Sequence, residues 1–205
     1  MASVSEWVVR EYFELLGFLV NQPCKHSVPG RQKTADEEVD LVVFNPRAGE
    51  SARRVDRLVW TTADLRHVKR AVVGIRGWHT ERFYASTFEQ SPDILRFIEA
   101  DSIRFAAKVL GSSSLCRVLC LPKLPASAGL REQALGLLKR RGIDGVLTFG
   151  TILSELILQA DVNRNYEKSD LLQVVRLLKN YDFIKDTQLE FFTKKRKRRR
   201  GQTFN

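Results

Sequence analysis

The hydrophobic pattern of the first half of the chain predicts one helix followed by three strands. Residues 4–16 place apolar side chains on one side at about 100° per residue, the period of an amphipathic helix. Short apolar runs bounded by Gly, Pro or Asn then predict strands at residues 18–22, 38–44 and 71–78. The last of these runs is apolar on both faces except at Arg76, which is typical of a central strand.

The second half of the chain predicts helices that alternate with strands. Ser91 and Pro92 have the residue types of an N-cap and a first helical position, and they begin a predicted helix that runs to about Leu110. The remaining predicted elements are a strand at 115–121, a helix at 130–141, a strand at 143–149, and helices at 151–161 and 169–181. A meander followed by βαβ units predicts an α/β fold, with a mixed β-sheet flanked by helices on both faces and helices at the C-terminal end.

The composition places this fold in one domain. The chain has 205 residues, of which 43 % are apolar and 28 % charged, within the range of globular domains. No run approaches the ~20 apolar residues of a membrane span, and the first apolar stretch lacks a signal-peptide pattern, so we expect an intracellular protein without a membrane partner. Cys24, Cys116 and Cys120 have no CxxC spacing and only three histidines could join them, so we expect reduced thiols and no zinc site.

The positive charge is concentrated at the C-terminal end. The formal net charge is +10, and it falls to +3 without the seven consecutive basic residues Lys194, Lys195, Arg196, Lys197, Arg198, Arg199 and Arg200. Like charges this dense repel one another, so we predict a domain over residues 1–185 and a disordered basic tail over 186–205. Such a tail binds phosphates of DNA or RNA without sequence preference. Its alternative interpretations are a solvated solubility tail and a nuclear-localisation-like signal.

Three positions stand out against the apolar pattern. The predicted helix stripe consists of Val4, Trp7, Val8, Tyr12 and Leu15, and Glu11 falls in the middle of it. Asp40 lies inside an otherwise apolar predicted strand. A carboxylate in such a place is costly unless it is paired or binds a cation. Arg76 lies on the next strand, on the same face as Gly74 and Trp78, and Glu6 and Arg10 project from the opposite side of the helix.

This arrangement resembles the PD-(D/E)XK nuclease-like superfamily of restriction endonucleases and Holliday-junction resolvases, over roughly residues 4–150. The resemblance implies an α-β-β-β-α-β core in which a helix glutamate, a strand aspartate and an acidic-X-Lys triplet meet around magnesium. Carried over residue by residue, Glu11 matches the helix acid and Asp40 the strand aspartate. Both would then be catalytic residues and ligands of Mg²⁺ or Mn²⁺, with Arg76 as the third member of the site.

The triplet departs from the family pattern. Gly74 stands where the family has an acid, and Arg76 stands where it has lysine. Magnesium requires several oxygen ligands, so the loss of one carboxylate weakens the site. Arginine stays protonated, so Arg76 can bind a phosphate but cannot transfer a proton. His79 and Glu81 are accessory candidates for a cation, with a hydrogen-bonded strand-end residue and a surface charge as the alternative interpretations. Alternatively, Asp40, Arg76 and Glu11 could pair with one another in a cluster that contains no metal.

The sequence therefore predicts a nucleic-acid-binding protein of nuclease-like fold with a degenerate metal site. The first alternative is an active Mg²⁺- or Mn²⁺-dependent nuclease that uses Asp40 and Glu11, and the second is an assembly subunit anchored to nucleic acid by its basic tail. The chain contains no GxxxxGK[ST], GxGxxG or GxSxG motif, which excludes the common nucleotide-dependent and hydrolase classes. Because many resolvase-like enzymes act as dimers, a homodimer is a further candidate assembly. The expected location is cytoplasmic or nucleoid-associated, or nuclear in a eukaryote.

Overall fold

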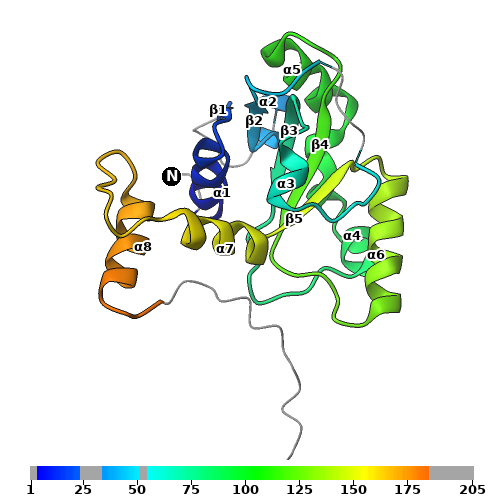
Figure 1. The fold of residues 1–205 in the computed structure, drawn as a ribbon. Helices are drawn as coiled ribbons and strands as arrows, with labels where there is room; N and C mark the ends of the chain where they lie inside the picture. Colours follow the sequence, from blue (N-terminus) through cyan, green and yellow to red (C-terminus); the bar gives the residue numbers. More distant parts are fainter. Residues whose placement is uncertain (1–3, 24–33, 51–54, 185–205) are drawn as a thin grey trace, which may run out of the picture.

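A five-stranded mixed sheet lies at the centre of the computed structural model, which describes residues 4–23, 34–50 and 55–184 (Figure 1). Its strands are β1 (Leu19–Asn21), β2 (Leu41–Phe44), β3 (Arg70–Ile75), β4 (Cys116–Leu121) and β5 (Gly145–Thr148), and they lie side by side in chain order. The first three are antiparallel, and β3, β4 and β5 are parallel. The mixed sheet predicted from the sequence is confirmed.

Helices cover both faces of the sheet (Figure 1). They are α1 (Val4–Leu15), α2 (Ala35–Glu38), α3 (Thr62–Leu65), α4 (Ala85–Gln90), the 3₁₀ helix η1 (Pro92–Ile98), α5 (Ala100–Leu110), α6 (Ala128–Arg140), α7 (Phe149–Gln159) and α8 (Asp170–Asn180). One core lies between the sheet and the helices α1 and α7 and extends to α8, which packs against α7. A second core lies between the sheet and η1, α5 and α6. No helix among the described residues is long and apolar enough to span a membrane.

The strands show why the chain folds with two cores. Along β3, Ala71 and Val73 pack into the core beneath α1, whereas Val72 packs into the core on the opposite face. All three side chains are fully buried. Alternating side chains of a strand point to opposite faces, so a strand that is apolar at every position must be covered on both sides.

Two predicted elements begin or end differently in the structure. The predicted helix at 91–110 is divided, because Glu99 has an extended backbone (φ −62°, ψ 158°) between η1 and α5. The buried hydroxyl of Ser102 donates a hydrogen bond to the carbonyl of Arg96 (3.0 Å) and so fixes this break. The prediction that Asp40 lies inside a strand is also wrong: α2 ends at Glu38, and β2 begins at Leu41.

A short segment continues the sheet beyond β5. Val59 forms an isolated parallel bridge with Val146. The amide of Trp60 donates to the carbonyl of Val146 (2.9 Å), and the amide of Val146 donates to the carbonyl of Leu58 (2.7 Å). The Trp60 ring fills the space that a Cβ at Gly145 would need. The outer edge of β5 is therefore covered by residues 58–60.

Candidate functional site

Asp40 and Arg76 form an ion pair where β2 begins and β3 ends. The Oδ2 atom of Asp40 accepts hydrogen bonds from Nη1 of Arg76 (2.8 Å) and from the backbone amide of Ile75 (2.7 Å). The two side chains are only 20 % and 13 % exposed. Removing both charges from water is costly, and the direct ion pair together with the hydrogen bond from Ile75 offsets part of that cost. Of the metal-free Asp40–Arg76–Glu11 cluster that the sequence left open, the structure contains the contact between Asp40 and Arg76.

The remaining donors of Arg76 are also engaged. Its Nε and Nη2 atoms donate to the carbonyl of Ile94 (3.0 and 2.6 Å), and Nη1 also donates to the carbonyl of Ile75 (2.7 Å). A longer contact of 3.5 Å joins Nη2 to the carbonyl of Asp93. A guanidinium has five N–H groups, and here each has a protein acceptor. Arg76 is therefore a structural link between β3 and η1 rather than a free phosphate ligand.

The position of Gly74 is filled by an aromatic ring. A Cβ atom at Gly74 would overlap Cδ1 and Cε1 of Phe97, a fully buried residue of η1. The guanidinium carbon of Arg76 lies 5.7 Å from the centre of the same ring. An acidic side chain at this position, as the family resemblance implies, has no space in this fold.

These contacts test the predicted metal site. The described residues contain no group of three His, Cys, Asp or Glu side chains that could hold a metal ion. The carboxylate of Asp40 already faces a guanidinium, and Phe97 occupies the place of the missing acid. A magnesium ion needs several oxygen ligands without a competing cation at the same point. The residues present do not fit Mg²⁺ or Mn²⁺.

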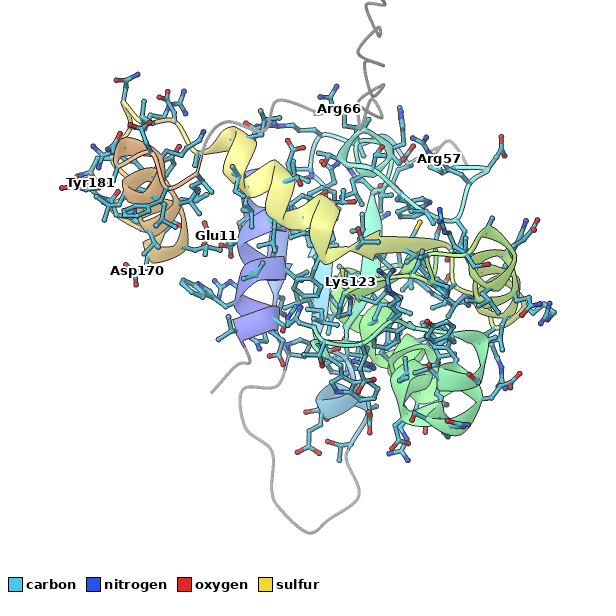
Figure 2. The ribbon with its side chains drawn as sticks, turned by 90° about the horizontal axis from the view of Figure 1, so that it is seen from below. Glu11, Arg57, Arg66, Lys123, Asp170 and Tyr181 are labelled. Atoms are coloured by element: carbon cyan, nitrogen blue, oxygen red, sulfur yellow. The ribbon has the colours of Figure 1, made fainter. Side chains whose placement is uncertain are left out.

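Glu11 lies away from Asp40 and Arg76. The buried face of α1 consists of Ser5, Val8, Val9, Tyr12 and Phe13, whereas Val4 and Trp7 are exposed, so the predicted stripe is rotated from the true one. Glu11 is half-buried beside that face, and Figure 2 shows it on the side of α1 turned toward α8. It forms no hydrogen bond or ion pair within the part of the chain that the structure describes. The structure therefore does not bring Glu11 to the predicted site.

Glu6 is the acid of α1 that the sequence analysis missed. Its carboxylate accepts a hydrogen bond from Nε2 of Gln22 (2.8 Å), the residue that follows β1. Because Asn21 pairs with Val42, Gln22 lies at the sheet end where Asp40 precedes β2. Because each residue of an α-helix turns by about 100°, the side chains of Glu6 and Glu11, five residues apart, point in directions that differ by about 140°. No local signal marked this side of the helix, because Ser5, which is buried there, is polar and is held by Gly77 and His79 far along the chain.

His79 and Glu81 lie in the segment after β3. The His79 ring contacts Oγ of Ser5 (3.1 Å) through Nε2 and packs edge-on against Phe149 (4.6 Å between centres). Glu81 is exposed, and no described residue pairs with its carboxylate. His79 therefore ties the first turn of α1 to the start of α7. This matches the interpretation of His79 as a hydrogen-bonded residue at a strand end.

Several exposed cations have no acidic partner among the described residues. Lys139, Arg140 and Arg141 are consecutive at the end of α6. Lys123 lies at the opposite end of the sheet, where β5 passes into α7 (Figure 2). The basic run from 194 to 200 lies outside the described residues. The three cations of α6 are the densest group of unpaired positive charge in consecutive described residues.

The chain was compared with protein-family models, curated proteins and solved structures. No family model, curated protein or solved structure matches it.

Proposed function

We propose that this chain is a nucleic-acid-binding protein of nuclease-like fold, in which an internal ion pair replaces the metal of the cleavage site. The order α1, β1, β2, β3, α5, β4 supports the proposal, because the superfamily resemblance implies an α-β-β-β-α-β core. The helices α2, α3, α4 and η1 are additions to that order.

The observation that carries the proposal is the contact between Asp40 and Arg76. Asp40 immediately precedes β2, and Arg76 immediately follows β3, the neighbouring strand. The resemblance assigns a strand aspartate and a triplet lysine to these two residues. The guanidinium supplies the positive charge that a metal would supply there. A fixed guanidinium cannot activate water as a metal does. Binding without cleavage is the function that this geometry supports.

Phosphate contacts are assigned to the unpaired cations of α6 and to the basic tail. Lys139, Arg140 and Arg141 stand at the C-terminal end of α6, where positive charge is also favoured by the helix dipole. The three side chains remain available to bind an anion, because no described side chain pairs with them. Phosphate contacts of this kind supply affinity and orientation without sequence preference.

The binding test measures the affinity of the full chain for labelled duplex DNA, single-stranded DNA and RNA by fluorescence anisotropy at several salt concentrations. Replacing Lys139, Arg140 and Arg141 together by Gln should reduce the logarithmic salt slope by about 3. The matched control replaces Arg104, Lys108 and Lys168, which are also exposed, by Gln and should not change the slope beyond the effect of net charge. Absence of binding at low salt, or equal slopes for both triple variants, would contradict the assignment.

The cleavage test uses the same labelled nucleic acids with added Mn²⁺, beside the variant Asp40→Ala. We expect no cleavage by either protein, while binding persists in both. Cleavage by the natural chain that disappears in Asp40→Ala would establish the metal-dependent nuclease instead. That result would also require a second carboxylate, for which Glu6 is the first candidate to replace.

A further inference from the structure

A cavity of about 450 Å³ lies at the opposite end of the sheet from Asp40 and Arg76. It is bounded by the end of α1, the loop after β2, α3 and α7. Its volume falls within the range of pockets that hold small organic ligands. None of the groups in the preceding proposal lines it.

Two unpaired guanidinium groups line this cavity. Arg47 and Arg66 are both exposed, and neither side chain has an acidic or hydrogen-bonding partner among the described residues. Gly17 has a positive φ of 86°, and a Cβ there would stand 3.3 Å from the guanidinium carbon of Arg47, so the turn after α1 packs directly on this side chain. Two like charges that share one cavity repel each other, and an anion between them removes that repulsion.

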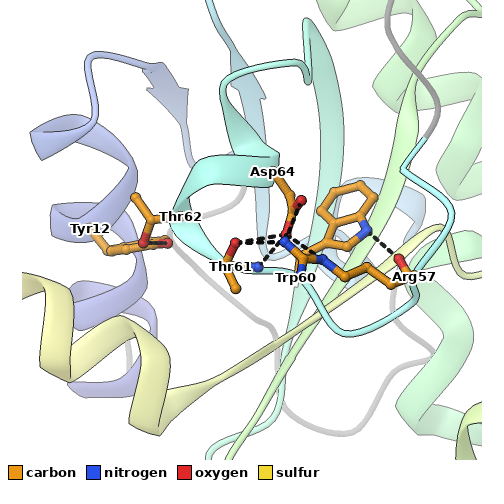
Figure 3. A network of polar contacts seen from close by, with 6 residues as sticks. All are labelled: Tyr12, Arg57, Trp60, Thr61, Thr62 and Asp64. Atoms are coloured by element: carbon orange, nitrogen blue, oxygen red, sulfur yellow. Dashed lines mark hydrogen bonds and ion pairs between the residues drawn. The ribbon is translucent and has the colours of Figure 1, made fainter. Parts of the chain in front are cut away.

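The one acid of the lining is already satisfied. Glu155 accepts hydrogen bonds from Oγ1 of Thr62 (3.0 Å) and from Nε2 of Gln159 (2.8 Å). The hydroxyl of Tyr12 lies 3.0 Å from Oγ1 of Thr62 (Figure 3). Because Thr62 donates its only proton to Glu155, Tyr12 must donate to Thr62. Glu155 is thus held in place by hydrogen bonds from neutral groups and forms no ion pair with Arg47 or Arg66, so the two arginines and this one acid leave the lining with a net positive charge.

A buried amide offers a further donor. Asn45 is 5 % exposed and lines the cavity. Its Oδ1 atom accepts a hydrogen bond from the backbone amide of Arg47 (3.0 Å), and its Nδ2 atom has no acceptor among the described residues. The bond from the Arg47 amide holds the Asn45 side chain in place at the cavity wall, where its Nδ2 group can donate to a ligand. The rest of the wall is apolar and is formed by Leu15, Leu16, Phe18 and Leu65.

We propose that this cavity binds a small organic phosphate, with the phosphate between Arg47 and Arg66 and an apolar or aromatic body against the partly exposed Leu15 and Leu16. Arginine pairs favour phosphate because a planar guanidinium can donate two parallel hydrogen bonds to its oxygens. The phosphate monoester can come from a free nucleotide or from the 5′ end of a nucleic acid. The proposal does not depend on the function proposed above, since the cavity shares no residue with that site.

The test measures binding of adenosine 5′-monophosphate to the full chain by isothermal titration calorimetry, beside adenosine and inorganic phosphate. We expect the monophosphate to bind at least tenfold more tightly than either part alone. Arg47→Gln and Arg66→Gln should each weaken binding about tenfold or more, as expected for loss of a charge-assisted hydrogen bond. Arg104→Gln removes the same charge from exposed α5 and should leave the affinity unchanged.

A second variant separates the cavity from general surface charge. Gln159→Trp fills the cavity while it retains both arginines, and it should abolish binding while circular dichroism stays that of the natural chain. Oligonucleotides with a 5′-phosphate or a 5′-hydroxyl then distinguish the sources, because preference for the phosphorylated end assigns the site to nucleic-acid ends. Equal affinity for adenosine and its monophosphate, equal losses in Arg104→Gln and Arg66→Gln, or full binding by Gln159→Trp would overturn the proposal.

Discussion

The ring of Phe97 determines which side chain position 74 can carry. It occupies the space in which any Cβ at Gly74 would lie. Both residues are buried, so neither can move into solvent. The packing of η1 on β3 therefore excludes an acidic side chain at position 74.

Gly74→Ala should reduce the free energy of unfolding by about 1–3 kcal/mol, because an added methyl group in a filled core forces its neighbours to shift. Urea denaturation measures this loss. Gly49→Ala is the control, since a Cβ there meets nothing within 4 Å. The double variant Gly74→Ala/Phe97→Leu should lose less than the sum of the single changes; strict additivity would mean that the ring does not constrain position 74.

Arg76→Gln should destabilise the fold by about 2 kcal/mol, because it removes the guanidinium that forms an ion pair with Asp40 and hydrogen bonds with Ile94. Breaking a fully buried ion pair costs more stability, but Asp40 and Arg76 both remain partly exposed to solvent, which screens their charges. Asp40→Asn combined with Arg76→Gln should cost less than the two single losses added together. Chemical denaturation of all four proteins at pH 7 gives the coupling energy, and a coupling of zero would exclude the ion pair as a stabilising contact.

The thiol of Cys116 should react slowly with alkylating agents at neutral pH. Burial is the main cause that raises its pKa to about 11, and the nearby Asp144 carboxylate adds to it. Only the thiolate is a nucleophile. In a Cys24→Ser background, the iodoacetamide rate at Cys116, followed by mass spectrometry, should keep rising with pH beyond 9. A plateau near pH 8.5–9, where an ordinary thiol has titrated, would contradict the raised pKa.

At the scale of the element, α3 depends on one polar network (Figure 3). Asp64 accepts hydrogen bonds from the amide (2.7 Å) and the hydroxyl (2.8 Å) of Thr61 and from Nη2 of Arg57 (2.7 Å). Burial acts to raise the pKa of Asp64, but these hydrogen bonds outweigh it and lower the pKa below its usual value. A four-residue helix has little stability of its own, so this cap fixes where α3 begins.

Asp64→Asn should therefore lower stability by about 1 kcal/mol at pH 7. A carboxylate with a lowered folded-state pKa stabilises the protein above its unfolded pKa, and this contribution is lost as the pH falls through the folded value. The difference between the two proteins should shrink below about pH 4. Thermal unfolding from pH 7 to pH 3 measures it, with Glu89→Gln, an exposed acid, as the control. If the difference in stability between the two proteins does not change with pH, the charge of Asp64 does not contribute to stability.

The strength of the local pattern explains which elements were predictable. Long or well-bounded patterns mark the strands β4 and β5 and the helices α6, α7 and α8, and their predicted ranges agree with the structure within two residues at every end. The rotated stripe of α1 arose because Val4 and Trp7 are apolar yet exposed, while Ser5 is polar and buried. Tertiary contacts decide such positions: Ser5 is buried because it lies against Gly77 and His79, which are distant in the sequence.

At the scale of the molecule, the charge of the chain is unevenly divided between the domain and its C-terminal run. Replacing all seven basic residues from Lys194 to Arg200 by Ser should reduce the logarithmic salt slope of DNA binding by about 6. Residual affinity should persist through Lys139, Arg140 and Arg141. Anisotropy titrations from 50 to 200 mM salt measure the slope. Binding that vanishes entirely at low salt would restrict recognition to the tail and favour an assembly subunit tethered by it.

The candidate site was predictable only in part, for a geometric reason. The sequence left a metal-free contact between Asp40 and Arg76 open as one interpretation, and the structure contains that contact. It could not reveal that Ile94 and Phe97 of η1 surround the guanidinium, since these contacts join segments about 20 residues apart through a 3₁₀ helix that the pattern did not predict. The cavity beside Arg47 and Arg66 depends on four separate segments and has no local signature.

The strip of chain at residues 58–60 bears on how the protein behaves at high concentration. An open strand edge presents unpaired amides and carbonyls to other molecules and can seed aggregation. Here Leu58 and Trp60 take up the edge groups of Val146, and the indole of Trp60 donates to the carbonyl of Arg57 (3.0 Å), which holds the strip in place. Loss of Trp60 would thus do more than loosen the core. It would expose the edge of the apolar strand β5, to which strands of other copies of the chain could pair. The protein would therefore aggregate under conditions in which it is still folded.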